Sequence, residues 1–227
     1  MEKASTSSRG TKHKAPASQD AVPESRREKN KRQKMERIVT AARTLFRING
    51  YNNTTTQQVA DAADIGTGTL FLYAKSKGDL LLLVFKDELQ DYIDQAWRAL
   101  PDQASLYEQV DALLGGIISY HERDIPTARA LMRELAFPDN PDRREDIVDT
   151  QESILEKLTQ LVETARSTGE VRDNTSPRVA AECMFSIYHE QLELWLSDYV
   201  DYPVFRENLK RRIDFIIDGI KPANHRD

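Results

Sequence analysis

The sequence has one cysteine among its 227 residues, Cys183, and therefore cannot form an internal disulfide. This excludes a disulfide-stabilised secreted domain and is compatible with a reducing cytoplasm. No apolar run approaches the roughly 20 residues that cross a bilayer, and the N-terminus lacks the apolar core of a signal peptide. We therefore expect a cytoplasmic protein that has no membrane partner.

Strand patterns and catalytic motifs are missing as well. No segment reads as a strand with turn partners, and apolar residues recur instead every three or four positions, so we predict an all-α fold. The histidines have no visible nucleophile partner in the sequence, and residues 66–69 lack the Gly-Lys-Ser/Thr ending of a phosphate-binding loop. We do not expect an enzyme.

Charge is distributed unevenly along the chain, although the formal net charge is only −5. Residues 1–80 hold 15 Lys and Arg against 8 Asp and Glu, a balance of +7, whereas residues 81–227 carry −12. A basic N-terminal third attached to an acidic remainder fits a module that binds a polyanion. Charge alone leaves open a second interpretation, a basic tail followed by ordinary solvated helix faces.

Two short helices joined by a tight turn are predicted within residues 54–73. Thr55 can cap the first helix, and the Asp64-Ile65-Gly66 step ends it. The second helix, about Thr67 to Tyr73, turns Leu70 inward. Its outward positions form a slim, uncharged surface that fits a DNA major groove: Thr67, Gly68, Thr69 and Leu72. This is the helix-turn-helix arrangement.

The order of residues here resembles the tetracycline-repressor (TetR) family of transcription regulators over roughly residues 33–85. The positions that carry the resemblance are Thr54-Thr55, Val59-Ala60, Ala63, Ile65, Gly68-Thr69-Leu70-Phe71, Tyr73, Ser76-Lys77 and Asp79-Leu80. The chain departs from the family pattern at three positions. Family members usually have Gly in place of Asp64, commonly Tyr in place of Phe71, and an aromatic residue in place of Ala74.

The resemblance implies two sets of DNA contacts. Base-edge or groove contacts fall on Thr67, Gly68, Thr69, Phe71 and Leu72, and backbone contacts fall on Thr55, Tyr73 and Lys77. Hydroxyl groups can bind phosphate, and methyl or aromatic groups can rest on thymine methyls. Because the reading helix has no Arg or Asn, Gln57 on the preceding helix is the best candidate for a bidentate base contact.

The chain divides into three predicted regions. Residues 1–25 form a disordered basic tail, residues 26–78 a three-helix DNA-binding domain, and residues 79–220 a helical domain for ligand binding and dimerisation. Five basic residues at the start of the first helix either extend it toward DNA or have no role: Arg26, Arg27, Lys29, Lys31 and Arg32.

The remaining helices are placed by apolar spacing and by capping residues. A helix from about Ser25 to Asn49 packs against the two short helices of the helix-turn-helix and braces them. Tyr51 is expected to pack in the small core that these helices form. A Ser76-x-x-Asp79 capping box starts a long helix that touches both domains. Asn140 is the expected cap of a later helix, with Pro141 at its start.

The last two predicted helices, about 177–199 and 203–220, are apolar on more than one side. A helix of this kind must be covered on most sides, and its own domain hides only one face. We expect the second face to pair with another copy in a four-helix bundle, and the TetR resemblance implies the same homodimer. The alternative is the enclosed core of a monomer.

Aromatic and sulfur-bearing residues in the acidic domain suit a mostly apolar small-molecule pocket. The candidates are Trp97, Tyr120, His121, Met132, Phe137, Cys183, Met184 and Tyr188. Any one of them can instead be an ordinary core residue. His189 and Glu193 lie one helical turn apart, a spacing that can chelate a metal, but a third ligand is missing. No metal or cofactor is predicted.

These features predict a ligand-responsive, DNA-binding transcriptional regulator. The effector is a small, mostly apolar molecule that releases a repressor from a palindromic operator in double-stranded DNA. Two alternatives stay open. One is a regulator of the same fold that has no small-molecule ligand and responds to a protein partner, and the other is a helical enzyme.

Overall fold

The computed structural model of the chain describes residues 25–223, which form nine α-helices and no β-strand. The helices are α1 (Arg26–Asn49), α2 (Thr56–Ala62), α3 (Thr67–Leu70), α4 (Lys77–Arg98), α5 (Leu106–Glu122), α6 (Ile125–Ala136), α7 (Arg143–Ser167), α8 (Pro177–Leu196) and α9 (Tyr202–Ile220). The all-α prediction is confirmed. The predicted N-terminal tail lies outside the described residues, except for Ser25.

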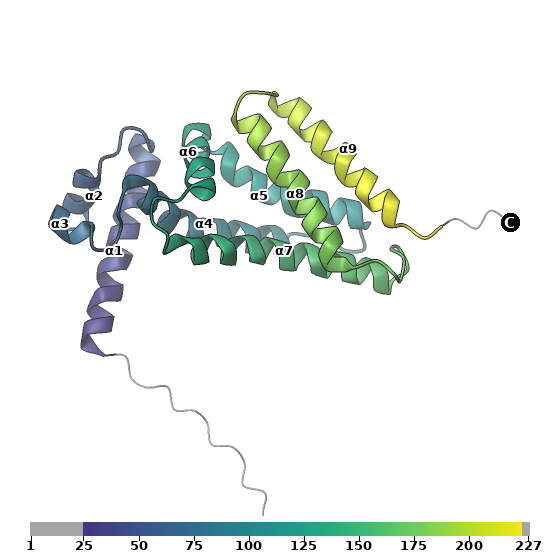
Figure 1. Cartoon of the computed structure of the whole chain (residues 1–227), viewed down its shortest axis with the longest axis horizontal. Helices are drawn as coiled ribbons and strands as arrows, with labels where there is room; N and C mark the ends of the chain where they lie inside the picture. Colours follow the sequence, from purple (N-terminus) through teal and green to yellow (C-terminus); the bar gives the residue numbers. More distant parts are fainter. Residues whose placement is uncertain (1–24, 224–227) are drawn as a thin grey trace, which may run out of the picture.

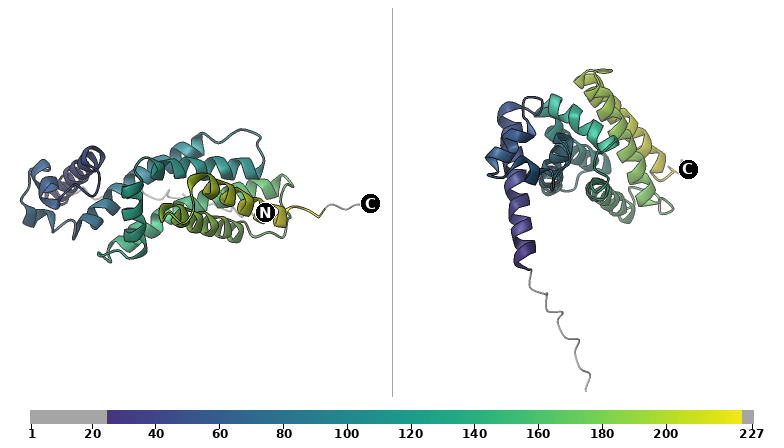
Figure 2. Two further views of the ribbon diagram at one scale, coloured as in Figure 1. Left: turned by 90° about the horizontal axis from the view of Figure 1, so that it is seen from above. Right: turned by 60° about the vertical axis from the view of Figure 1, so that its left-hand side comes forward.

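The helices are arranged as a small group and a larger body, with α4 running between them (Figure 1). Helices α1 to α3 lie at one end of the molecule, and α5 to α9 form the body, as the two further views also show (Figure 2). Helix α4 packs against α1, α5, α6 and α7. It is therefore in contact with both parts.

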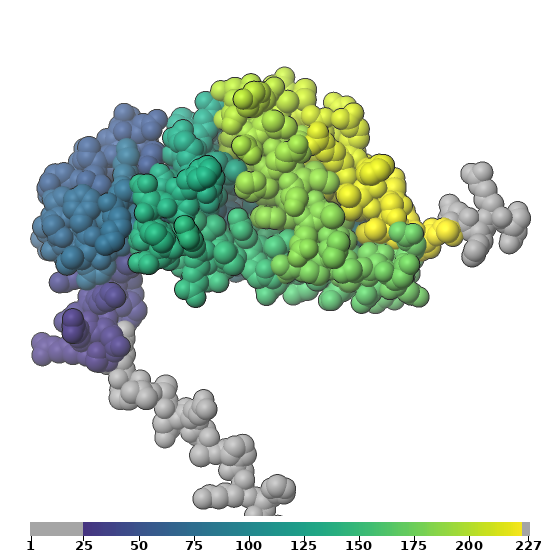
Figure 3. All heavy atoms as spheres, in the orientation of Figure 1, coloured from purple at the N-terminus to yellow at the C-terminus, as the bar shows by residue number. Residues whose placement is uncertain are grey.

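Helix α1 projects from the molecule over its first half, as the space-filling view shows (Figure 3). Residues 26–34 are charged or polar and exposed, whereas Ile38, Ala42 and Phe46 recur every four residues and are buried. Burying side chains as large as Ile and Phe stabilises the fold by about 1.5–3 kcal/mol each. The Tyr51 ring completes this small core, 5.4 Å from the Phe46 ring centroid, as predicted.

Two helix boundaries and one cap differ from the sequence prediction. Helix α3 ends at Leu70, and the chain continues to Tyr73 in turns. Helix α7 begins at Arg143, two residues after the predicted start at Pro141. The Asn140 side chain accepts from the amide of Asp142 at 3.2 Å and donates to Asp79 on α4 at 2.8 Å. The Ser76 capping box is only half formed, since its Oγ accepts from the amide of Asp79 while the Asp79 carboxylate bonds elsewhere.

None of the helices within residues 25–223 combines the length and the hydropathy that a bilayer crossing requires.

Candidate nucleic-acid interface and central cavity

Asp64 and Arg37 hold the turn between α2 and α3. Asp64 has a φ of 52°, in the left-handed region that favours Gly and that Asp and Asn tolerate better than other residues. The guanidinium of Arg37, on α1, donates to the carbonyl of Ala63 and, at 3.1 Å, to the carbonyl and the carboxylate of Asp64. Helix α1 therefore helps to fix the angle between the two short helices.

Gln57 links the two short helices through its side-chain amide. Its Oε1 accepts from the Thr67 hydroxyl at 2.6 Å, and its Nε2 donates to the Asp61 carboxylate at 2.8 Å. The side chain is exposed, but both ends of the amide are engaged. A bidentate base contact by Gln57 remains a prediction, and it requires the side chain to release both bonds.

The outward face of α3 and the following turn is slim and mostly apolar. Leu72 is 79% exposed and Phe71 is partly exposed, whereas Leu70 is fully buried, as predicted. A Cβ added to Gly68 would meet no atom within 4 Å. The fold therefore does not require Gly at this position and leaves room for another molecule to approach the backbone.

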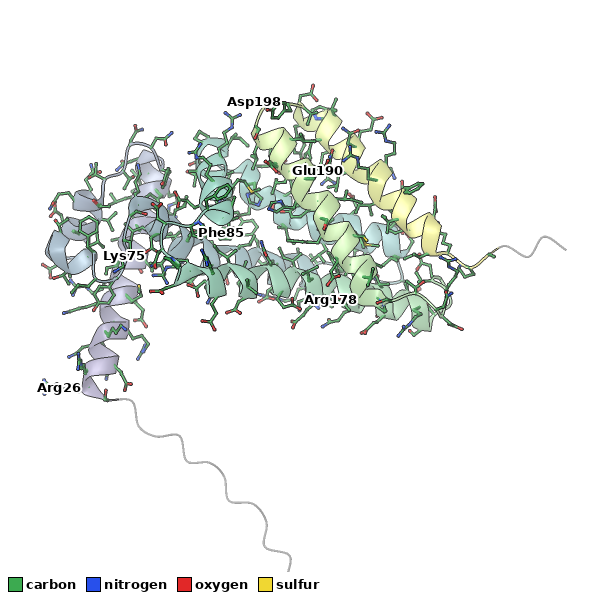
Figure 4. The ribbon with its side chains drawn as sticks, in the orientation of Figure 1. Arg26, Lys75, Phe85, Arg178, Glu190 and Asp198 are labelled. Atoms are coloured by element: carbon green, nitrogen blue, oxygen red, sulfur yellow. The ribbon has the colours of Figure 1, made fainter. Side chains whose placement is uncertain are left out.

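Residues that flank this face also hold the fold together. The Lys77 ammonium donates to the carbonyls of Tyr51 (3.0 Å) and Asn52 (3.3 Å), which ties α4 to the turn between α1 and α2. The Thr55 hydroxyl caps α2. Lys75 is exposed at the same end of the molecule and is a further cation that sequence reasoning missed (Figure 4).

A buried polar cluster joins this end of the molecule to α7. The Asp79 carboxylate, which is fully buried, accepts from the amides of Lys75 and Asn140, each at 2.8 Å, and from the guanidinium of Arg143. Arg143 also donates to the Tyr73 carbonyl at 3.1 Å. The backbone just after α3 is therefore bonded directly to the first residue of α7. No pattern in the sequence predicts this long-range cluster.

A cavity of about 40 Å³ lies in the body where α4, α5, α6, α7 and α8 meet. Its wall is mostly apolar and includes Phe85, Leu89, Ile147, Ile154, Phe185 and Leu192. The polar or titratable residues on its wall are His121, Thr150, Gln151, Tyr188 and His189. Figure 4 shows Phe85 in the middle of the molecule. The cavity combines an apolar interior with a few polar groups, which is typical of small-molecule sites.

His121 and Tyr188 are the two buried titratable residues on the cavity wall. The His121 side chain is 3% exposed, and its Nε2 lies 3.5 Å from the Tyr188 hydroxyl. Burial, together with nearby His189, lowers the pKa of His121 to about 4. Burial also raises the pKa of Tyr188. At neutral pH both groups are therefore uncharged, as an apolar cavity favours.

A surface groove between α6 and α8 adjoins the cavity. The groove has a volume of about 390 Å³, and Met132 and His189 line both spaces. Arg129 and Arg133 also line the groove, next to Phe137, whose side chain is 85% exposed. Arg129 forms an ion pair with Asp198. The groove offers cationic and aromatic groups beside an apolar interior.

The eight predicted ligand residues separate into three groups. His121, Met132 and Tyr188 line the cavity, and Phe137 lines the groove beside it. The other four lie elsewhere: Trp97 beside Lys157, Tyr120 against Phe85 and Tyr92, Met184 in the core, and Cys183 on the exposed side of α8.

Sequence reasoning missed several cavity residues, and one signal could have found two of them. Thr150 and Gln151 lie on the same helical stripe as Ile147 and Ile154, which the apolar spacing assigns to the core. A few polar residues within a buried apolar stripe are typical of a small-molecule site. His189 was considered only as a metal ligand. Among the described residues, no group of three His, Cys, Asp or Glu side chains could hold a metal.

Helices α8 and α9 leave apolar residues on the molecular surface. Phe215 is 78% exposed and Val179 is 55% exposed, and Cys183 lies between them in sequence on the exposed side of α8. Ion pairs also involve these two helices: Arg178 pairs with Glu152, and Arg212 pairs with Glu190. Figure 4 labels Arg178 and Glu190, both on α8. An exposed apolar face with a polar rim is typical of a protein interface.

Comparison with known protein sequences places the N-terminal part of the chain in a family. Residues 38–84 match the family model described as "Bacterial regulatory proteins, tetR family". The chain is 25% identical over 174 residues to the fatty acid metabolism regulator protein of Bacillus subtilis (strain 168), which covers 77% of this chain and 89% of that protein. It is 26% identical over 166 residues to the HTH-type transcriptional repressor KstR of Rhodococcus jostii (strain RHA1). This match covers 73% of this chain and 74% of that protein.

Solved structures of similar fold extend over most of the chain. Thermus thermophilus FadR in complex with lauroyl-CoA has a TM-score of 0.67 at 22% identity, covering 85% of this chain and 98% of that chain. Bacillus subtilis FadR in complex with stearoyl-CoA has a TM-score of 0.62 at 22% identity, covering 82% of this chain and 98% of that chain.

The family match and the curated relatives identify this N-terminal helix-turn-helix, joined to a larger helical body, as that of a DNA-binding transcription regulator. The match of residues 38–84 to the tetR family model confirms the resemblance to the TetR family that residues 33–85 predict.

Proposed function

We propose that the protein is a homodimeric repressor that binds a palindromic operator and is released from it by a long-chain acyl-CoA. The observation that carries the proposal is the position of α7. This one helix forms part of the wall of the apolar cavity through Ile147 and Ile154 and bonds through Arg143 to the backbone that follows α3. An effector in the cavity thus has a direct connection to the DNA-reading end.

The exposed face around α3 is the proposed DNA-reading surface. Thr67, Gly68, Thr69, Phe71 and Leu72 supply groove contacts in this proposal, and Thr55, Tyr73 and Lys77 lie at the phosphate backbone. The face has no charged side chain, so shape and thymine-methyl contacts carry most of the specificity. The basic first turns of α1, which project from the molecule, add an attraction that does not depend on sequence.

The exposed apolar residues of α8 and α9 support the proposed dimer interface. Pairing these helices with those of a second copy covers Val179 and Phe215 in a four-helix bundle. Two reading helices then face the same side of the dimer. They must lie about 34–36 Å apart to enter successive major grooves, and the two-fold symmetry of the dimer makes the operator a palindrome.

The apolar cavity and two structural relatives support an acyl-CoA effector. The relatives were solved in complex with lauroyl-CoA and stearoyl-CoA. The cavity of about 40 Å³ is far below the roughly 300–1,000 Å³ of ordinary ligand pockets. An acyl chain can therefore enter only if the surrounding helices move apart, so it binds the displaced arrangement better than the present one.

Displacement of α7 offers a route from the cavity to DNA. Because Arg143 bonds to both Asp79 and the Tyr73 carbonyl, a shift of α7 has one of two results. It either breaks these bonds or pulls on the reading corner, which consists of α2, α3 and the turn that continues to Tyr73. Either result changes the spacing of the two reading helices in the dimer and weakens operator binding. By thermodynamic linkage, the operator must weaken effector binding by the same factor.

Selection of bound fragments from random double-stranded DNA tests this proposal. We expect a consensus with two-fold symmetry. In a fluorescence anisotropy titration with that DNA, lauroyl-CoA should release the protein and CoA alone should not. A consensus without symmetry contradicts the dimer on a palindrome, and an operator complex that no acyl-CoA weakens contradicts the effector class.

A further inference from the structure

One nitrogen of the cavity residue His121 has no hydrogen-bond partner within the protein. Nδ1 is buried and unpaired, while Nε2 faces the Tyr188 hydroxyl at 3.5 Å. A neutral imidazole carries one N–H donor and one acceptor nitrogen. Buried polar atoms are almost always paired in native proteins, so an unpaired one needs an explanation.

Neighbouring polar groups do not supply the missing partner. The Thr150 hydroxyl already donates to the carbonyl of Asp146 at 2.9 Å. Two other titratable side chains lie close to His121: His189, which also lines the cavity, and Tyr120, whose ring centroid is 5.4 Å from that of His121. The only bond made by the Tyr188 hydroxyl among the described residues is the one to Nε2. The rest of the wall is mainly apolar, so His121, which lines the cavity, keeps spare bonding capacity at Nδ1.

We propose that His121 recognises the thioester carbonyl of the acyl-CoA effector, with Tyr188 setting the tautomer. This inference rests on the effector class proposed above. The Tyr188 hydroxyl donates to Nε2, which places the imidazole proton on Nδ1, and Nδ1–H then donates to the carbonyl oxygen. The acyl chain occupies the apolar remainder of the cavity beside Phe85 and Ile154.

This arrangement makes the effector site selective for a chain that carries an acceptor near its head. A site built to hydrogen-bond a ligand group discriminates against an analogue that lacks the group, because its own polar atom is then left unpaired. An alkyl chain of the same length but without a carbonyl fills the apolar part equally well. It therefore has to bind more weakly.

Isothermal titration calorimetry of the full-length protein with two probes tests the inference. The probes are lauroyl-CoA, a thioester, and S-dodecyl-CoA, a thioether of equal chain length without the carbonyl. We expect the thioester to bind about 10-fold more tightly, the factor that one added hydrogen bond of ordinary net strength provides. His121→Phe should reduce the ratio of the two affinities to about one while the thioether still binds.

Two further variants separate recognition from folding. Tyr188→Phe removes one oxygen and leaves the ring in place, so it should lower the thioester preference several-fold, and it carries the test if His121→Phe fails to fold. Met132→Leu, on the apolar wall, should change both affinities by a similar factor and leave the preference intact.

Three results overturn the inference, and they are distinguishable. Equal binding of the two probes by the unaltered protein rejects the role of His121 while the acyl-CoA effector stands. A preference that survives in both His121→Phe and Tyr188→Phe assigns the carbonyl to another group. Binding of neither probe rejects the acyl-CoA effector itself, and with it the role of His121.

Discussion

At Gly68 the backbone carries no side chain, although the surrounding protein leaves space for one. In helical geometry Ala is favoured over Gly by roughly 0.5–1 kcal/mol, so Gly68→Ala should leave the free energy of unfolding unchanged or raise it by about 1 kcal/mol. If the backbone there approaches DNA closely, the added methyl group should weaken operator binding by about 10-fold. Thermal unfolding and operator anisotropy measure the two effects. A variant with unchanged operator affinity would remove Gly68 from the reading surface.

His121 makes stability depend on pH, because its pKa in the folded protein is lowered to about 4 from an ordinary value near 6.5. Between these values the unfolded chain binds a proton that the folded protein does not, so acid favours unfolding. We expect this contribution, about 3 kcal/mol, to be present above pH 6.5 and to be lost progressively as the pH falls toward 4. Urea unfolding of the unaltered protein and of His121→Phe measures it. Parallel pH curves for the two proteins would contradict the assignment.

At the scale of elements, α7 spans the distance between the cavity and the reading corner. Its first residue pairs with the buried Asp79, and its next turns form part of the cavity wall. Helix α4 also touches both parts, but its N-terminus is held in place by the side chains of Asn140 and Arg143. The position of α4 relative to the body therefore depends on α7.

Arg143→Ala tests this dependence. Removing the guanidinium leaves the Asp79 carboxylate buried without its charged partner, which should lower the free energy of unfolding by about 3 kcal/mol. In the folded fraction, the factor by which lauroyl-CoA weakens operator binding should fall toward one, because the bond to Tyr73 is lost. Arg144→Ala is the matched control, since Arg144 is exposed on the same turn and has no such contact with Asp79. Equal coupling factors in the two variants would exclude Arg143 from the route.

At the scale of the whole molecule, operator affinity depends on joining two reading helices in one dimer. Phe215→Arg places a charge on the proposed interface, where burial without a partner is costly. We expect a monomer by light scattering and an operator affinity at least about 100-fold lower, because each half-site is then bound separately. Phe137→Arg, at a similarly exposed position directly after α6, should remain dimeric. A dimeric Phe215→Arg protein would move the interface elsewhere.

The helices and the reading corner could largely be predicted from the sequence, because they depend on local chemistry. Ser25, Thr55 and Ser105 cap helices in the structure as capping residues do in peptides. The cavity was predicted less completely. Met132 and Tyr188 line it, whereas Cys183, another candidate chosen for its side-chain type, faces outward. Residue type alone does not say which side of a helix meets its neighbours.

What the sequence determined by itself was therefore the set of helices, the small helix-turn-helix with its slim outward face, and the resemblance to the TetR family. These follow from interactions between residues a few positions apart, such as caps, apolar stripes and turn residues. Only the tertiary structure decided that Arg143 meets Asp79 and that His121, on the cavity wall, keeps an unpaired nitrogen. It also decided that α7 connects the cavity with the reading corner. Those contacts join residues more than 20 positions apart, and their formation depends on how whole helices pack.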